Sequence, residues 1–256
     1  MIQCVGLTRR FGAQTAVDGV SLEVGRGELL ALVGGSGSGK TTTLRMINRL
    51  IEPSAGTVRI DGELTSAVPG HVLRRSIGYV FQSIGLFPHM TVAQNIGVTP
   101  SLLGWSQPRI AERVEKLLVL VELERELGAR LPEALSGGQQ QRVAVARALA
   151  AHPKVLLLDE PFGALDPLTR DRLQAGFRKL QQDLRLTAVL VTHDMTEALV
   201  LADRIAVMHE GKLIQIGQPR ELLAQPSHDY VSQLLEAPRR QARKFDALSL
   251  EAGQRA

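Results

Sequence analysis

The glycine-rich stretch GGSGSGKT, from Gly34 to Thr41, has the residue types that bind phosphate groups. Glycines let backbone N–H groups turn inward around phosphate oxygens, and the helix expected after them adds the positive end of its dipole. The Lys40 ammonium can reach terminal phosphates, and the Thr41 hydroxyl can ligate Mg²⁺. A flexible linker is the alternative, but a strand-like run before the stretch and a helix-like run after it favour a phosphate loop. The predicted nucleotide contacts are Gly34, Gly35, Ser36, Gly37, Ser38, Gly39, Lys40, Thr41 and Thr42.

Two adjacent carboxylates follow the apolar run VLLL at 155–158. Asp159 ends a run with the character of a buried strand, where an unpaired carboxylate is costly, and a magnesium ion would offset that cost. Glu160 is the candidate for the group that orients or deprotonates an attacking water molecule. A pair of solvated loop acids before Pro161 is the alternative, and the phosphate loop favours the metal-and-base interpretation.

Gln82 and His193 each follow an apolar run, and each is a weak signal alone, because a single histidine after a strand is more often structural than catalytic. Beside the carboxylates, Gln82 could contact the metal or the water, and His193 could donate a hydrogen bond to the terminal phosphate and hold Glu160 in register. Phosphoryl transfer to water depends mainly on positioning and charge stabilisation, which this set could supply.

A second glycine-rich helix start, LSGGQ, lies at 135–139. Ser136 is a plausible N-cap, Gly137 and Gly138 allow close approach to the backbone, and Gln139 follows in the first turn. A simple capped helix is the alternative, but one serine would suffice for it. Because two glycines cost helix stability, a second phosphate contact at these residues is favoured.

The elements that must position these residues alternate between strands and helices. Continuous apolar runs at 28–34, 78–81, 155–158 and 188–192 predict buried parallel strands, covered by helices on both faces. Ligands of such sheets bind at the carboxyl ends of the strands, so we expect Lys40, Gln82, Glu160 and His193 to converge there. The first 63 residues read mainly as further strands, residues 83–150 as mostly helical, and residues 204–217 as a hairpin around Glu210.

Composition excludes several classes of protein. The 256 residues are 44% hydrophobic, which is enough for a sizeable core, and the net charge of +4 is mild. Aromatic residues make up only 4%, which argues against a stacking platform for single-stranded nucleic acid. The single cysteine, Cys4, excludes an intrachain disulfide and favours a reducing compartment. No signal peptide or apolar run of membrane-spanning length is expected.

The order GGSGSGKT, Gln82, LSGGQ, VLLLDEP, GALD at 163–166 and His193 resembles the ATPase subunit of an ABC transporter, over about residues 1–235. The resemblance implies an α/β fold of the P-loop NTPase (RecA-like) type, with a mixed, mainly parallel sheet, an N-terminal antiparallel β subdomain and an inserted helical subdomain at about 83–150. It implies ATP and Mg²⁺ as cofactors, with Phe11 stacked on adenine. It also implies a head-to-tail homodimer, in which LSGGQ closes over the partner's ATP and Asp166 lies in a loop that communicates across the interface.

Residues 81–105, FQSIGLFPHMTVAQNIGVTPSLLGW, are similar to the importer branch for quaternary amines such as glycine betaine, choline and carnitine. This implies an integral membrane permease, a periplasmic or lipid-anchored substrate-binding protein, and a peripheral position on the cytoplasmic face of the inner membrane, without nucleic acid. Leu86, Phe87, Met90 and Trp105 would contact the permease or pack in the subdomain core. Many members carry C-terminal CBS modules, which we do not expect here, and Gly35 stands where proline is common.

Three alternatives stay open from the sequence. The same ATPase mechanism could serve another small solute, such as an amino acid or a sulfonate, because this subunit does not touch the cargo. A soluble ABC ATPase acting on nucleic acid would need tandem domains, a coiled coil or zinc-binding inserts, and none of these is expected. A nucleotide-binding regulator without turnover is the third. Residues 236–256, which include Arg239, Arg240, Arg243 and Lys244, are predicted to be a basic, disordered tail.

Overall fold

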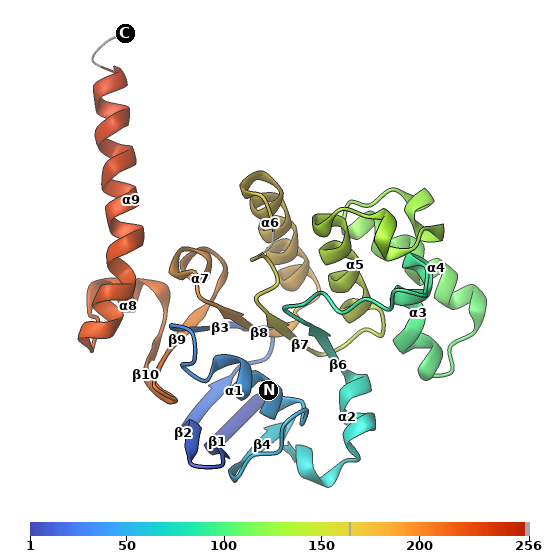
Figure 1. The fold of residues 1–256 in the computed structure, drawn as a ribbon, viewed down its shortest axis with the longest axis horizontal. Coiled ribbons are helices and arrows are strands. Elements are labelled where there is room, and N and C mark those ends of the chain that lie inside the picture. Colours follow the sequence, from blue (N-terminus) through green and yellow to red (C-terminus); the bar gives the residue numbers. More distant parts are fainter. Residues whose placement is uncertain (164, 254–256) are drawn as a thin grey trace.

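A computed structural model describes residues 1–163 and 165–253 and shows two β-sheets with a helical part at one side (Figure 1). The six-stranded sheet has the order β10-β9-β3-β8-β7-β6, and the four-stranded sheet has the order β2-β1-β4-β5. The α/β class with a mixed main sheet, an N-terminal antiparallel sheet and a helical insertion is therefore confirmed.

The larger sheet is parallel from β9 to β6, and only β10 runs antiparallel at its edge. Its strands are β3 (Leu29–Val33), β6 (Ile77–Val80), β7 (Val155–Asp159), β8 (Thr187–Thr192), β9 (Arg204–His209) and β10 (Lys212–Gly217). Every residue of β3, β7 and β8 is buried, as expected of parallel strands that are covered on both faces.

Alternate residues of each central strand serve two hydrophobic cores. Leu29, Ala31 and Val33 of β3 face a core built with the helices, whereas Leu30 and Leu32 face a core shared with the antiparallel sheet. This division follows from the two-residue period of a strand. The helices on the first face include α6 (Pro167–Asp183) and α7 (Met195–Leu201).

The antiparallel sheet encloses the helix that follows the glycine-rich loop. Its strands are β1 (Ile2–Phe11), β2 (Gln14–Val24), β4 (Ala55–Ile60) and β5 (Glu63–Leu64), and α1 (Lys40–Ile47) packs between this sheet and the larger one. Cys4 is 1% exposed in this core, and burial raises the pKa of its thiol to about 12. The 3-10 turn η1 (Thr65–Ala67) and α2 (Gly70–Ser76) then lead to β6, and α2 is not among the helices predicted from the sequence.

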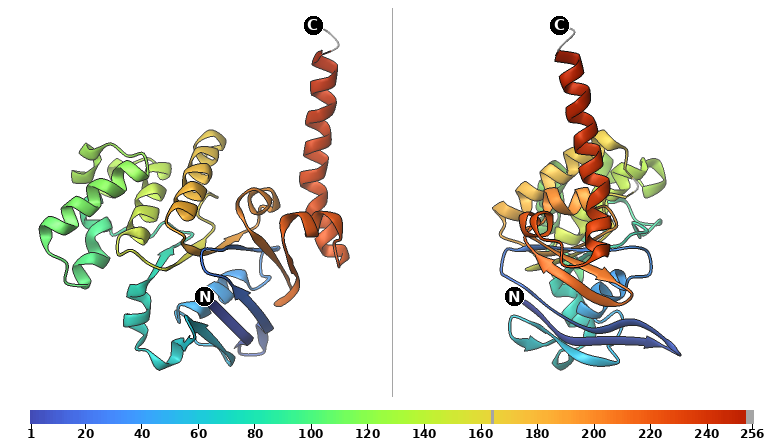
Figure 2. Two further views of the ribbon diagram at one scale, coloured as in Figure 1. Left: turned by 180° about the vertical axis from the view of Figure 1, so that it is seen from behind. Right: turned by 90° about the vertical axis from the view of Figure 1, so that its left-hand side faces the viewer.

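The helical part consists of α3 (Val92–Leu102), α4 (Gln107–Leu120) and α5 (Gly137–Leu149), with the 3-10 turns η2 (Arg125–Ala129) and η3 (Pro132–Ala134) between α4 and α5. Thr91 caps α3 and Ser136 caps α5, each in a capping box with a glutamine three residues later. This part and the C-terminal helix lie at opposite ends of the larger sheet (Figure 2).

The C-terminal segment differs from the sequence expectation. After α8 (Pro219–Ala224), one helix, α9 (Asp229–Gly253), continues where a short helix and a disordered tail are expected, and it extends away from both sheets (Figure 1). Its second half, QARKFDALSLEAG, contains three alanines and two leucines, which have high helix propensity, so its composition is compatible with a helix. The last three residues of the predicted tail, 254–256, lie outside the described residues.

Candidate active site

The phosphate loop connects β3 to α1 and surrounds the side chain of Lys40. The Lys40 Nζ atom donates to the carbonyl oxygens of Gly34 and Gly35 at 2.8 Å each, and it lies 3.4 Å from Ser38 Oγ. Burial lowers the pKa of Lys40, and the nearby carboxylates of Glu160 and Asp159 oppose that shift. The ammonium is therefore already held inside the loop, close to the two acids.

Two glycines of the loop have no room for a side chain. A Cβ atom on Gly34 would lie 2.1 Å from the Met208 carbonyl oxygen of β9, and one on Gly39 would lie 2.6 Å from the Ala16 carbonyl oxygen of β2. Gly39 also has a left-handed φ of 98°, which other residues rarely adopt. The loop thus packs directly against the backbones of β9 and β2, and this close approach requires glycine at both positions.

Asp159 is fully buried at the end of β7, beside α1. Thr41 Oγ1 donates to its Oδ1 at 2.8 Å, Tyr79 Oη lies 3.4 Å from its Oδ2, and Arg45 Nη2 lies 3.9 Å from the same oxygen. Burial raises the pKa of this carboxyl, and Thr41, Arg45 and Tyr79 partly counteract the rise. Of the three predicted metal ligands, Thr41 and Asp159 are therefore adjacent, whereas the side chain of Gln82 contacts Glu160.

Glu160 leaves β7 in a left-handed conformation, with φ of 47°, and its N–H donates to the Val191 carbonyl oxygen of β8 at 3.0 Å. Its carboxylate has one partner on each oxygen. Gln82 Nε2 donates to Oε2 at 3.1 Å, and His193 Nδ1 lies 3.3 Å from Oε1. The structure thus brings together three side chains that the sequence placed only at the ends of separate strands.

The LSGGQ stretch begins α5 and lies in a different part of the molecule from the phosphate loop (Figure 1). Gln139 N–H donates to Ser136 Oγ at 3.3 Å, and Ser136 N–H donates to Gln139 Oε1 at 2.9 Å. Ser136 and Gly137 are exposed, and Gly138 is half-buried. Within the described residues no hydrogen bond joins this stretch to the phosphate loop, so the two predicted phosphate contacts lie on separate parts of the chain.

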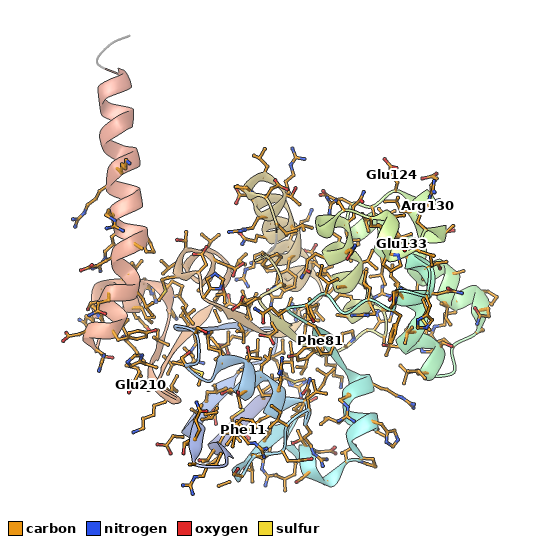
Figure 3. All side chains as sticks on the ribbon, viewed as in Figure 1. Phe11, Phe81, Glu124, Arg130, Glu133 and Glu210 are labelled. Atoms are coloured by element: carbon orange, nitrogen blue, oxygen red, sulfur yellow. The ribbon has the colours of Figure 1, made fainter. Side chains whose placement is uncertain are left out.

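Two further predicted residues lie outside the central cluster. Phe11 is 45% exposed at the β1–β2 hairpin, with the Arg9 guanidinium 4.5 Å from its ring centroid (Figure 3). Asp166 is the N-cap of α6, where its Oδ1 accepts from Thr169 N–H at 3.0 Å, and this contact lowers the pKa of its carboxyl. Asp166 therefore has a local structural role, and its role at a dimer interface stays a prediction.

Sequence reasoning missed Tyr79 and Arg45, which both contact Asp159. Arg45 stands four residues after Thr41 on α1, a spacing that places both on one helix face, so it could have been found. Tyr79 pairs with Leu157 of β7, which becomes apparent only once β6 is known to neighbour β7.

The comparisons define the class of protein. The chain belongs to the ABC transporter family, whose model matches residues 17–163. It is similar to MJ0796, described as a bacterial ABC transporter cassette in a dimeric structure, with a TM-score of 0.80 and 34% identity over 86% of this chain and 99% of that one. A second structure of MJ0796, with a TM-score of 0.79 and 33% identity over 86% of this chain and 99% of that one, is a dimer after hydrolysis bound to ADP and Pi.

Among individual relatives, the chain is 52% identical to the glycine betaine/carnitine/choline transport ATP-binding protein OpuCA of Bacillus subtilis, over 88% of this chain and 59% of that protein. It is 51% identical to the glycine betaine uptake system ATP-binding protein YehX of Escherichia coli, over 91% of this chain and 76% of that protein. The chain thus spans less than two thirds of the length of OpuCA.

Proposed function

We propose that this chain is the ATPase subunit of an importer and couples ATP hydrolysis to uptake of a quaternary ammonium osmoprotectant, such as glycine betaine, choline or carnitine, through a separate membrane permease. The observation that carries the proposal is the meeting of Gln82, Glu160 and His193 beside the phosphate loop. ATPase-subunit relatives named for these solutes, at 51–52% identity, support the choice of cargo.

The residues beside the loop fit a magnesium ion. Among the described residues no group of three or more His, Cys, Asp or Glu side chains is placed to hold a metal. Mg²⁺ needs no such group, because it binds through one or two protein oxygens together with phosphate oxygens and water. Thr41 and the buried Asp159 offer those oxygens, and the pKa of Asp159, raised by burial, marks a carboxylate that a cation would stabilise. When bound there, Mg²⁺ would neutralise charge on the phosphates.

Each residue of the site then has a separate role in hydrolysis. Lys40 binds the terminal phosphates, and the loop amides hold them in line with the site. Glu160 orients the attacking water and accepts its proton as the water oxygen bonds to the terminal phosphorus and the bond from that phosphorus to ADP breaks. Gln82 and His193 hold the Glu160 carboxylate from either side, and His193 would donate a hydrogen bond to the terminal phosphate.

The separation of the two predicted phosphate contacts supports a homodimer. The exposed Ser136 and Gly137, with the half-buried Gly138, would contact ATP bound at the loop of a second copy. The dimeric cassette of the related MJ0796 supports such a head-to-tail arrangement. Phe11 would stack on the adenine. Asp166 would lie near the interface. Isolated subunits should therefore bind nucleotide but hydrolyse it slowly.

A permease could dock where the helical part meets the larger sheet. A cavity of about 250 Å³ lies there, lined among others by Tyr79, Phe81, Phe87 and Arg147. Phe87 is 40% exposed at its rim, and Arg147 donates to the carbonyl oxygen of Gly85 at 2.6 Å, so the loop after Gln82 is tied to α5. By contrast, Leu86 and Trp105 pack against the main core, which favours the structural alternative for these two.

The proposed placement is the cytoplasmic face of the inner membrane, with the permease and a substrate-binding protein as partners. No helix in the described part of the chain has the length and apolar character needed to cross a membrane. The cargo is tested by uptake of labelled glycine betaine and choline in cells with and without this subunit. Unchanged uptake of both solutes in its absence would refute the assignment.

The catalytic part is tested by Glu160→Gln. Because the amide cannot accept the proton of water, hydrolysis should fall by about 10²-fold or more while ATP binding persists. ATP-dependent dimers should also accumulate, which sedimentation or light scattering would detect. An unchanged ATPase rate in this variant would show that Glu160 is not the base, and absence of any turnover in the wild type with its permease would favour a regulator.

A further inference from the structure

The phosphate loop makes a contact with the C-terminal helix that no motif indicates. The N–H of Gly35 donates to the hydroxyl oxygen of Tyr230, in the first turn of α9, with 2.7 Å between N and Oη. The two residues are separated by 195 positions in the sequence. A Cβ atom on Gly35 would lie 3.2 Å from the same hydroxyl, so the phenol is packed closely against the loop.

Tyr230 is held in place from three directions. Its ring stacks on His209 at the end of β9, with centroids 3.9 Å apart and planes inclined by 26°. Its backbone N–H donates to His228 Nδ1 at 3.0 Å. The next residue, Val231, and Leu235 one turn later are fully buried in the main core. The hydroxyl is therefore fixed by both the sheet and the core.

Two contacts thus restrain the first residues of the loop from outside. Gly34 lies against the Met208 carbonyl oxygen, and Gly35 is bonded to Tyr230. The amides at the beginning of α1 have no carbonyl partner within their helix, which leaves them available to phosphate oxygens. An ordered first half of the loop reduces the entropy lost when the second half closes on phosphate.

We propose that Tyr230 is a positioning residue for ATP: its hydroxyl holds the Gly35 end of the phosphate loop in the conformation that binds the triphosphate. This inference rests on the proposed function, since it assumes that ATP is the ligand. It also explains why Gly35 suits this chain, because the proline common at this position in the family has no N–H to donate. α9 thereby becomes part of the nucleotide site, although it contributes no phosphate contact.

The first test is Tyr230→Phe, which keeps the ring and its stacking and removes only the hydroxyl. A neutral hydrogen bond of this kind corresponds to about a three- to tenfold weaker ATP affinity, measured with a fluorescent ATP analogue. The KM for ATP should rise by the same factor while kcat changes less than about twofold, whereas partial unfolding would lower kcat and leave KM unchanged. Ser232→Ala, which removes a hydroxyl from the same helix, is the matched control and should bind ATP like the wild type.

The second test is a double-mutant cycle with Gly35→Pro, which deletes the donor. In that background Tyr230→Phe should not weaken ATP affinity further, because there is no N–H left to pair and the proline ring would meet the hydroxyl directly. An equal loss in both backgrounds, or a Tyr230→Phe affinity equal to the wild type, would overturn the role of the hydroxyl while leaving the proposed ATPase intact. A wild type that binds no ATP would remove the proposed function and this inference together.

Discussion

Replacing Asp159 by asparagine separates the structural role of this residue from its proposed metal role. The substitution preserves volume, so it opens no cavity at a position that is fully buried. In the wild type, Oδ1 accepts from Thr41, and Oδ2 faces Tyr79 and Arg45. In the variant an NH₂ group replaces one of these two oxygens, so only one acceptor remains. The variant also removes a charge that burial disfavours.

Opposite consequences follow for the free and the nucleotide-bound protein. Without nucleotide, the lost hydrogen bond and the relief from burying a charge offset each other, so stability should stay within about 1 kcal/mol of the wild type. With Mg²⁺ and ATP at about 100 times Kd, the wild type should gain about 2.7 kcal/mol. For a domain of this size that gain corresponds to a rise of roughly 5–10 °C in Tm.

Thermal unfolding with ATP in the presence and absence of Mg²⁺ measures this directly. The wild type should show the larger rise in Tm only when Mg²⁺ is present. Asp159→Asn should show the same smaller rise with Mg²⁺ as with EDTA. If Asp159→Asn showed a Mg²⁺-dependent rise equal to that of the wild type, Asp159 would not be a metal ligand. If the variant lost several degrees of Tm without nucleotide, the lost hydrogen bond would outweigh the removal of the buried charge.

Three further outcomes are expected. Gly34→Ala should lower the free energy of unfolding by about 1–3 kcal/mol, seen as a lower urea midpoint, because its Cβ would overlap the Met208 carbonyl. A Cβ on Gly137 would have no atom within 4 Å, so Gly137→Ala should cost less than about 0.5 kcal/mol, yet it should slow ATPase turnover. Equal urea midpoints for the two variants would contradict the packing argument. Phe87→Ala should leave the permease-free ATPase rate unchanged and reduce co-purification with the permease, and undiminished co-purification would remove Phe87 from that interface. Burial raises the pKa of Asp159, so the wild type should lose stability relative to Asp159→Asn as pH rises from the ordinary aspartate range through the raised pKa. A difference in free energy of unfolding between the two proteins that stays constant with pH would exclude this linkage.

The convergence of the site was predictable because a parallel sheet gathers strand ends. Gln82, Glu160 and His193 each follow a continuous apolar run, and such runs form neighbouring strands whose carboxyl ends share one edge. The N-cap role of Ser136 was also readable, since a serine before two glycines and a glutamine three positions later form a local signature that needs no tertiary contact.

The remaining contacts depend on strand order and on segments distant in sequence. Tyr79 reaches Asp159 only because β6 neighbours β7, and Tyr230 reaches Gly35 only because α9 begins beside β9. Neither relation leaves a trace in spacing or hydrophobic pattern. The extent of α9 was also not predicted, although the alanines and leucines of its second half have high helix propensity.

The backbone bond from Glu160 to Val191 has a consequence for amide exchange. This N–H closes the ladder between β7 and β8, two strands whose residues are all buried. As the last rung of a ladder between two buried strands, this N–H should exchange with deuterium more slowly than the amides of an exposed loop. The backbone of the proposed base is thus held in place by the sheet, whereas its side chain can still change conformation.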